Sequence, residues 1–128
     1  MYSEKSLSII EKTLSDKIIH AQSLLRKNVN EWFSFAPVSV YMIVGDYHRL
    51  GDPDIERKPC LVISSISVSE NKIGKGYFKA FMSVIVKLAQ KHHYRIVFES
   101  VDNPQLRAWL IQHDYTYVGY VENYYKDL

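Results

Sequence analysis

Cysteine is nearly absent from this 128-residue sequence: Cys60 is the single one, so no disulfide can form within the chain. Small extracellular domains usually depend on disulfides, and a lone cysteine therefore favours a reducing, cytoplasmic setting. No apolar run approaches the roughly 20 residues that a membrane-spanning helix needs. The polar N-terminal stretch also lacks the apolar centre of a signal peptide. We therefore expect neither a disulfide scaffold nor a membrane segment.

An excess of one charge is also missing. The 16 lysines and arginines face 14 acidic residues, and the formal charge of +2 is too small to indicate nucleic-acid binding by itself. Between Lys72 and Arg95, however, six basic residues occur without an acid, so this segment is locally cationic. The five histidines are scattered and lack the spacing of metal ligands, and we expect no metal site.

What is present is the balance of a folded protein, with 47% apolar and 23% charged residues, and we expect one domain over residues 1–128. Apolar residues recur every three or four positions from Glu4 to Asn28, including Leu25, which predicts an amphipathic helix with Ser3 as its N-cap. β-Branched runs predict strands over 38–44, 60–68 and 95–101. The glycine- and proline-containing segment 45–59 reads as a loop.

A second apolar stripe, formed by Phe78, Phe81, Ile85 and Leu88, predicts a helix over 77–92. Asn103 and Pro104 form the cap and first turn of a short helix, and the tyrosine-rich tail after it alternates enough for one or two strands. The order strand, helix, strand from residue 60 to residue 101 predicts a right-handed crossover, so its two strands should be parallel. The expected fold class is α/β: a mainly antiparallel sheet with one parallel pair at its centre.

The loop NKIGKGYF, Asn71 to Phe78, lies between the strand and the helix of that crossover. Amides at a helix N-terminus lack intrahelical acceptors and attract anions, and glycine lets a phosphate approach them closely. The loop lacks the Gly-Lys-Ser/Thr ending of a Walker A motif and the three glycines of the dinucleotide pattern. From the loop alone, a simple turn and a phosphate cradle stay equally open.

The flanking motifs ISV-SENKI-GKG-YFKAF and VFESV-DN-PQL-RAWL-IQHDY keep a familiar order and spacing. With them, residues 60–121 resemble the GNAT superfamily of acetyl-CoA-dependent N-acetyltransferases, specifically small members with a G-K-G-x-F loop. The resemblance implies a splayed pair of parallel strands, helices on both faces of the sheet, and CoA bound in the splay. It implies three groups of binding residues: Ile66, Ser67 and Val68, whose backbone holds the pantetheine and polarises the thioester; the pyrophosphate amides of Ile73, Gly74, Lys75, Gly76, Tyr77 and Phe78; and Asn103 beside the pantetheine arm.

The sequence departs from the family pattern at four positions. Ile73 stands where the family loop has Arg or Gln, and Phe78 where it has a small residue. The positions of the usual carboxylate base and tyrosine acid hold Cys60 and Leu110, so no side chain can be assigned a catalytic role. Cys60 has no histidine partnered to it and reads as a small buried strand residue.

Two further groups could take part in catalysis: the Glu99 carboxylate and the tyrosines of the C-terminal tail. Glu99 lies within a strand, and a structural carboxylate is the favoured interpretation over a catalytic one. The tyrosines of the tail read as strand packing with polar tips in water. One of them could lend a phenol to the cleft, but none can be singled out: Tyr115, Tyr117, Tyr120, Tyr124 and Tyr125.

The leading hypothesis is an N-acyltransferase that uses acetyl-CoA and an amine acceptor, which attacks the thioester directly. The alternative is a catalytically weak or inactive GNAT-fold module that binds CoA or regulates a protein partner. A third reading, a member acting on charged tRNA, would require a wide basic surface; the cationic segment is largely what CoA's own phosphates need. The acceptor, small molecule or protein, cannot be read from the sequence, and a homodimer stays open.

Overall fold

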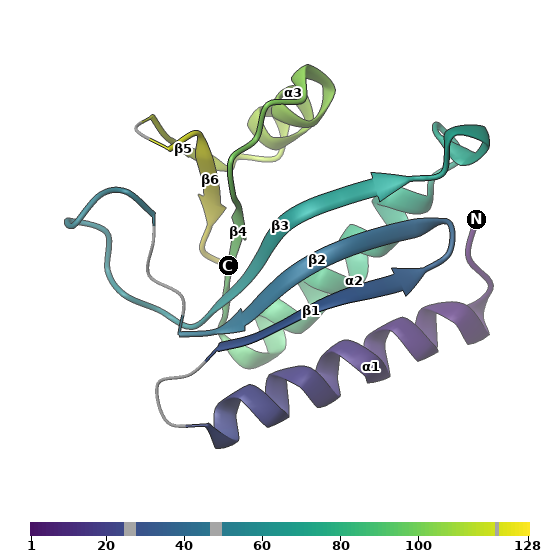
Figure 1. The fold of residues 1–128 in the computed structure, drawn as a ribbon, viewed down its shortest axis with the longest axis horizontal. Helices are drawn as coiled ribbons and strands as arrows, with labels where there is room; N and C mark the ends of the chain where they lie inside the picture. Colours follow the sequence, from purple (N-terminus) through teal and green to yellow (C-terminus); the bar gives the residue numbers. More distant parts are fainter. Residues whose placement is uncertain (25–27, 47–49, 120) are drawn as a thin grey trace.

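The computed structural model describes residues 1–24, 28–46, 50–119 and 121–128. Within these residues, three α-helices, a short 3₁₀ helix and six strands follow one another (Figure 1). In order they are α1 Glu4–Ser23, β1 Asn28–Phe35, β2 Val38–Gly45, β3 Cys60–Val68, η1 Glu70–Lys72, α2 Tyr77–His92, β4 Arg95–Phe98, α3 Pro104–Gln112, β5 Thr116–Val118 and β6 Asn123–Lys126.

The strands form one six-stranded mixed sheet in the order β1-β2-β3-β4-β6-β5. Every neighbouring pair is antiparallel except β3 and β4, which are parallel and lie at the centre. The α2 helix connects these two strands, as the expected crossover requires. The α/β class and the central parallel pair are therefore confirmed.

The elements with the strongest sequence patterns lie where they were expected. Strand β3 and helix α2 have the expected bounds, and strand β2 extends the expected strand by Gly45. The oxygen of the Ser3 side chain accepts a hydrogen bond from the Ser6 amide, which confirms the cap of α1. The tail forms two strands, β5 and β6.

Three boundaries differ from expectation. Helix α1 ends at Ser23, because Leu24 is already extended; the expected continuation through Leu25 lies outside the described residues, and Asn28 begins a strand. That strand, β1, was not expected, because its alternation is interrupted by polar residues and the exposed Trp32. Strand β4 ends at Phe98 rather than at Val101.

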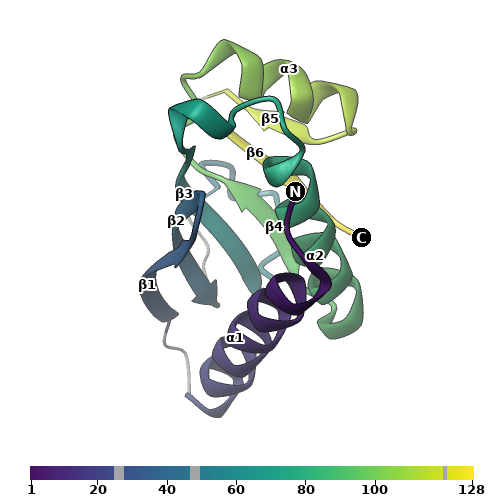
Figure 2. The ribbon, with the colours of Figure 1, turned by 90° about the vertical axis from the view of Figure 1, so that its right-hand side faces the viewer.

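The main core lies between the sheet and its helices. Helices α1 and α2 lie on the same side of the sheet, and α3 lies beyond the end of β4 (Figure 2). Buried residues of all three helices belong to one cluster, which includes Leu14, Ile85 and Leu110. On the other side, Cys60, Val62 and Val97 pack with Leu50 from the segment between β2 and β3. Among the described residues this segment, not a helix, covers that face, so the expectation of helices on both faces is wrong.

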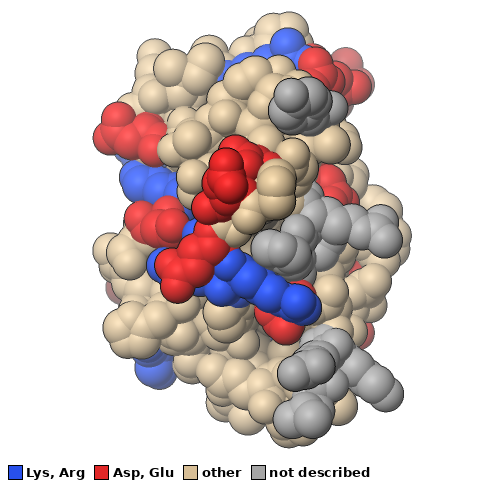
Figure 3. All heavy atoms as spheres, turned by 90° about the vertical axis from the view of Figure 1, so that its left-hand side faces the viewer, with Lys and Arg blue, Asp and Glu red and all other residues tan. Residues whose placement is uncertain are grey.

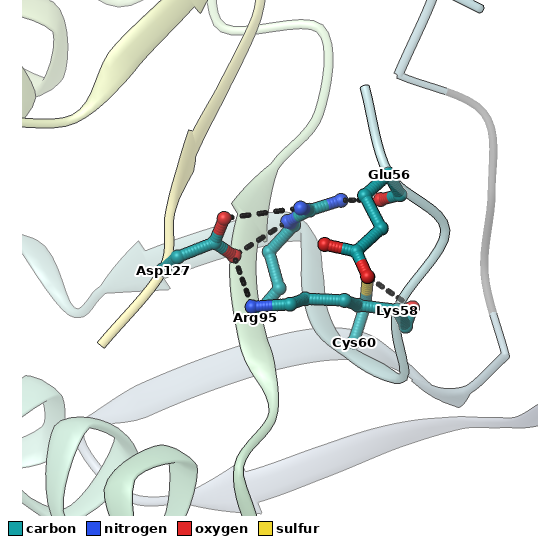
Figure 4. Close-up of polar contacts among 5 residues, drawn as sticks. All are labelled: Glu56, Lys58, Cys60, Arg95 and Asp127. Carbon is teal, nitrogen blue, oxygen red and sulfur yellow. Dashed lines mark hydrogen bonds and ion pairs between the residues drawn. The ribbon is translucent and has the colours of Figure 1, made fainter. Parts of the chain in front are cut away.

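A buried arginine, Arg95, links neighbouring segments at the end of the sheet where β3 and β4 begin (Figure 4). Arg95 is 2% exposed and donates two hydrogen bonds to the Asp127 carboxylate, 2.7 Å from Nε and 3.0 Å from Nη2. It also donates to the Glu56 carbonyl at 2.6 Å and stacks on the Tyr125 ring. These contacts tie β4 to the chain after β6 and to the segment before β3.

On the face seen in Figure 3, acidic and basic side chains are mixed rather than sorted by sign. Among the ion pairs of the described residues, Arg57 pairs with Asp46 at 3.0 Å. Two of the six bases in the cationic segment also have acidic partners, because Arg95 binds Asp127 and Lys87 lies 2.8 Å from Glu11. Within the described part of the chain, no helix has the length and apolar character needed to cross a membrane.

The Arg95 pair predicts a pH-dependent effect of one substitution. The hydrogen bond from Arg95 lowers the pKa of Asp127. A carboxylate with a lowered folded-state pKa stabilises the fold above about pH 4, its unfolded value, and loses that contribution as the pH falls through the lowered pKa. Asp127→Asn should reduce the free energy of unfolding by about 1–2 kcal/mol at pH 7, since Asp127 is partly exposed. The deficit should shrink in acid.

Urea unfolding at pH 7 and at pH 3 measures both effects. The matched control is Asp46→Asn, which breaks the exposed pair with Arg57 and should cost about 0.5 kcal/mol or less. Equal losses in the two variants would show that the buried guanidinium does not depend on Asp127.

Candidate functional site

A cleft of about 570 Å³ opens where the central parallel strands separate. Strands β3 and β4 pair over four residues each, from Cys60 with Arg95 to Ile63 with Phe98. Beyond that point β3 continues to Val68, whereas β4 ends. The segments 63–68 and 98–103 form the two sides of the cleft, and Ile73, Phe78 and Trp109 close it toward the helices.

Strand β3 bends at the start of the cleft. Ser65 pairs with Tyr41 and Ile63 pairs with Met42, so Ser64 is an extra residue without an opposite partner in β2. Such a β-bulge bends and twists its strand and often lies beside a functional site. After the bulge, from Ser65 to Val68, β3 pairs with β2 alone among the described strands. Its other edge faces the cleft.

Hydrogen bonds to residues around the start of β6, which lies on the other side of β4, turn the chain after β4 away from β3. The Glu99 amide still donates to the Ile63 carbonyl at 3.1 Å. Ser100 then adopts a left-handed conformation, with φ of 53°, and its amide donates to the Asn123 side-chain oxygen at 2.8 Å. The Val101 amide donates to the Glu122 carbonyl at 2.9 Å. The strands therefore separate because β4's continuation binds the residues around the start of β6.

One pair of side chains bridges the base of the cleft. The Ser64 hydroxyl donates to the Glu99 carboxylate over 2.6 Å, although the two residues are 35 apart in the sequence. Both residues are half-buried and line the cleft. Glu99 therefore forms a hydrogen bond, as a structural carboxylate would, and it also lies in the cleft. The sequence predicted no role for Ser64 or Asn123. The bulge could have been suspected from Ser64-Ser65, two polar residues that interrupt an otherwise apolar strand.

The glycine loop connects the cleft to helix α2. Gly74 and Gly76 both have positive φ, 78° and 87°, which favours glycine, and Gly76 is the N-cap residue of α2. Residues 77–79 form the first helical turn, whose amides have no acceptor within the helix. No hydrogen bond from these amides to another described residue is found. The loop therefore presents free donors at a helix N-terminus, as the phosphate reading requires.

The residues implied by the resemblance divide into two groups. Six line the cleft: Ile66, Ser67, Val68, Ile73, Phe78 and Asn103. Four lie outside its lining, on the glycine loop and the start of α2: Gly74, Lys75, Gly76 and Tyr77. The N-terminus packs against this second group at Tyr77, because the centroids of the Tyr2 and Tyr77 rings lie 5.0 Å apart. The Tyr2 hydroxyl also donates a hydrogen bond to the Phe35 carbonyl at the end of β1.

Asn103 caps α3, as the sequence predicts. Its side-chain oxygen accepts hydrogen bonds from the amides of Gln105 and Leu106, at 2.9 and 3.1 Å. Trp109, about one helical turn after Leu106, meets the Phe78 ring edge-on at 5.0 Å. The pair joins α2 and α3 into one wall of the cleft.

The two positions of the family's usual acid and base lie outside the cleft lining. Cys60 is fully buried at the other end of β3, where burial raises the pKa of its thiol to about 12, so it is a poor nucleophile. Leu110 is fully buried in the main core. A carboxylate or phenol at either position would have to reach the cleft from a buried site.

The tyrosine tail only partly follows its expected pattern. Tyr117 is exposed, but Tyr115 is buried and its hydroxyl finds no partner among the described residues, so the expectation of a polar tip in water is wrong there. Burial raises the pKa of Tyr115. Tyr120 lies outside the described residues, and so does His48. No tyrosine lines the cleft in the part of the chain that is described.

Comparison with known proteins adds no family assignment. No protein-family model matches the chain, and no curated protein matches it either. Within residues 1–24, 28–46, 50–119 and 121–128, no group of three or more His, Cys, Asp or Glu side chains could hold a metal ion.

The left-handed Ser100 predicts a stabilising substitution. A non-glycine residue in this conformation costs about 1–2 kcal/mol, and glycine would remove most of that cost while adding chain entropy to the unfolded state. We expect Ser100→Gly to raise the free energy of unfolding by about 0.5–1 kcal/mol. Ser67→Gly is the matched control: Ser67 is exposed on β3, and glycine within a strand should cost about 0.5–1 kcal/mol. Chemical denaturation that gives both variants the same loss would contradict backbone strain at Ser100.

Proposed function

We propose that this chain is an acetyl-CoA-dependent N-acyltransferase with a GNAT-like fold. The observation that carries the proposal is the cleft between β3 and β4. A central parallel pair that separates after four residue pairs leaves one edge of β3 open to a ligand. The resemblance of residues 60–121 to the GNAT superfamily implies a pantetheine arm in that place.

The open edge of β3 suits a pantetheine arm because the arm contains two amide groups. An extended ligand can pair with a strand edge through backbone hydrogen bonds, as peptides do in β-augmentation. The backbone from Ile66 to Val68 borders the cleft and would hold the arm and polarise the thioester carbonyl. Ile73, Phe78 and Trp109 supply an apolar wall on the helix side.

The glycine loop would hold the pyrophosphate. The amides of the first turn of α2 are free donors at the positive end of the helix dipole, a favourable site for an anion. Lys75 and Lys79 are exposed beside this turn. Ile73 replaces the family's polar residue, but the donors are main-chain amides and do not depend on that side chain.

In the proposed reaction acetyl-CoA supplies an acyl group already activated as a thioester. The chain's own contribution is to align an amine with the thioester and to place backbone donors at its carbonyl oxygen, where charge develops. A cytoplasmic setting, favoured by the lone cysteine, would give the protein access to acetyl-CoA.

The second candidate is a GNAT-fold module that binds CoA or regulates a protein partner with little or no turnover. It is favoured by one observation: neither Cys60 nor Leu110, at the usual acid and base positions, lines the cleft. The reading as a member acting on charged tRNA is weakened, because Arg95 is buried and Lys87 is paired with Glu11, which reduces the exposed basic surface.

The proposal predicts that acetyl-CoA binds with a stoichiometry near one and that the glycine loop sets the affinity. Gly76→Ala and Gly74→Ala should each weaken binding about tenfold or more, because a Cβ would project toward the approaching phosphate. Lys75→Ala combined with Lys79→Ala should cost less, and mainly at low salt, since mobile surface charges are screened. Isothermal titration calorimetry at two salt concentrations measures both effects.

Alanine is the right probe because valine would strain the positive φ of Gly76 further. A Cβ at Gly74 meets no atom within 4 Å, whereas one at Gly76 lies 3.4 Å from the Met1 sulfur, so Gly74→Ala avoids a contact while both variants share the strain of a positive φ. Gly119→Ala on the distant β5–β6 turn is the matched control and should bind like the parent. If both loop variants bind acetyl-CoA as tightly as the parent protein, the loop is a simple turn and not a phosphate site. If the parent protein does not bind acetyl-CoA, the proposed function is wrong.

A further inference from the structure

We infer that β1 is the interface of a homodimer, in which two copies of the chain join their sheets edge to edge with Trp32 at the two-fold axis. Strand β1 is the first in the sheet order, and its eight residues pair only with β2 among the described strands (Figure 1). This edge is separated from β3 and the cleft by β2. The inference therefore does not depend on the proposed function.

The outer edge of β1 offers unpaired backbone groups. In an antiparallel pair, alternate residues exchange hydrogen bonds with the neighbouring strand, and the residues between them direct their amides and carbonyls to the other side. Within the described part of the chain, the backbone of β1 has one hydrogen bond outside the sheet, which the Phe35 carbonyl accepts from the Tyr2 hydroxyl. The rest of the edge is a template for another strand.

Strand β1 lacks the features that usually prevent such pairing. Edge strands of monomeric proteins are protected by charged side chains, proline, bulges or a very short length. Strand β1 has eight residues, no proline and no lysine, and it pairs with β2 without a bulge. Its one charged residue, Glu31, is already paired with Lys17 of α1 at 3.2 Å. Trp32 is 61% exposed, and tryptophan is enriched at protein interfaces.

Symmetry and charge together select one register. Residues directly opposite each other in an antiparallel pair lie on the same face of the sheet, so a two-fold axis must bring one residue opposite its own copy. For two strands that run from Asn28 to Phe35, the overlap is longest when that residue is Glu31 or Trp32. Two copies of Glu31 would place like charges opposite each other, which is destabilising, whereas two copies of Trp32 form an aromatic pair.

The register centred on Trp32 brings together side chains of similar character. Trp32 already packs on Tyr41 of β2, with ring centroids 5.2 Å apart, so the dimer would have a row of aromatic rings across its axis. Residues 29–35 of the two copies pair, and the opposite pairs are Asn30 with Ser34, Val29 with Phe35, and Glu31 with Phe33. The charge of Glu31 stays compensated by Lys17 of its own copy.

This pairing ends at two copies. A two-fold interface uses the same surface of both chains, so neither β1 edge is left for a third copy. The other edge of the sheet, β5, has only three residues, and short edge strands resist pairing. The product is one continuous sheet with twice the 15.0 kDa of a single chain, and both clefts stay open because β2 lies between them and the interface.

The mass of the parent protein in solution is the first test. A strand pair of this length is smaller than a standard interface of about 1,600 Å², so we expect a dissociation constant in the micromolar range. Analytical ultracentrifugation between about 1 and 200 µM should show the mass rising from 15.0 kDa toward twice that value.

Two double variants test the register through charge. Asn30→Lys with Ser34→Lys places lysine opposite lysine and should raise the dissociation constant at least about tenfold. Asn30→Lys with Ser34→Glu places opposite charges there and should dimerise at least as tightly as the parent. Ile111→Lys is the matched control, because Ile111 is 63% exposed on α3, far from β1 in Figure 1. Circular dichroism checks that all three variants are folded.

Disulfide cross-linking tests the same register by distance. The native Cys60 is fully buried, so an introduced surface cysteine is the group that reacts. A mixture of Asn30→Cys and Ser34→Cys chains should form a linked dimer with one chain of each kind. Neither variant should link to itself, because the two copies of each residue lie four positions apart along the strands, roughly 13 Å.

Three results would overturn the inference. A parent that stays monomeric over the whole range would leave the β1 edge to a strand of another protein. A dimer that keeps its affinity with lysine at both positions, or that links through Asn30→Cys alone, would have another register or another interface. Dissociation by Ile111→Lys would place the contact on α3. Acetyl-CoA binding is measured separately, so none of these results decides the proposed function.

Discussion

Four residue pairs join β3 to β4, and beyond Ile63 and Phe98 each strand follows a different neighbour. At the paired end, the buried guanidinium of Arg95 ties β4 to Asp127 and to the segment before β3. At the other end, the bulge at Ser64 bends β3, and the amides after Glu99 bind residues around the start of β6. The cleft is the result of a parallel pair fastened at one end and separated at the other.

The separation is stable because it leaves few backbone groups unpaired. Buried amides and carbonyls must find partners, and continued pairing with β3 is the ordinary way to supply them. Here Asn123 and Glu122 accept from Ser100 and Val101 instead. The backbone that remains open lies on β3 beside the cleft and at the first turn of α2. Those are the two places where the proposed function puts a ligand.

Sequence patterns located the elements better than the contacts between them. Helix α2 was predicted to the residue because its apolar stripe is long, whereas residues 66–68, 73, 78 and 103, which line the cleft, were implied by the resemblance to the GNAT superfamily. Strand β1 was missed because the polar residues and exposed Trp32 of an edge strand give little periodic signal. The Ser64–Glu99 bond could not be predicted, because it depends on a bulge and on the register of two strands that no local pattern specifies.

Basic and acidic side chains lie at different places around the cleft. The bases of the glycine loop lie at a helix N-terminus, where the dipole adds to their positive field, and the carboxylates of Glu99 and Asp102 line the cleft itself. An anionic ligand and a cationic one would therefore be drawn to different parts of the same site. Under the proposed function, the phosphates of CoA would bind at the N-terminus of α2, outside the lining that holds the two carboxylates.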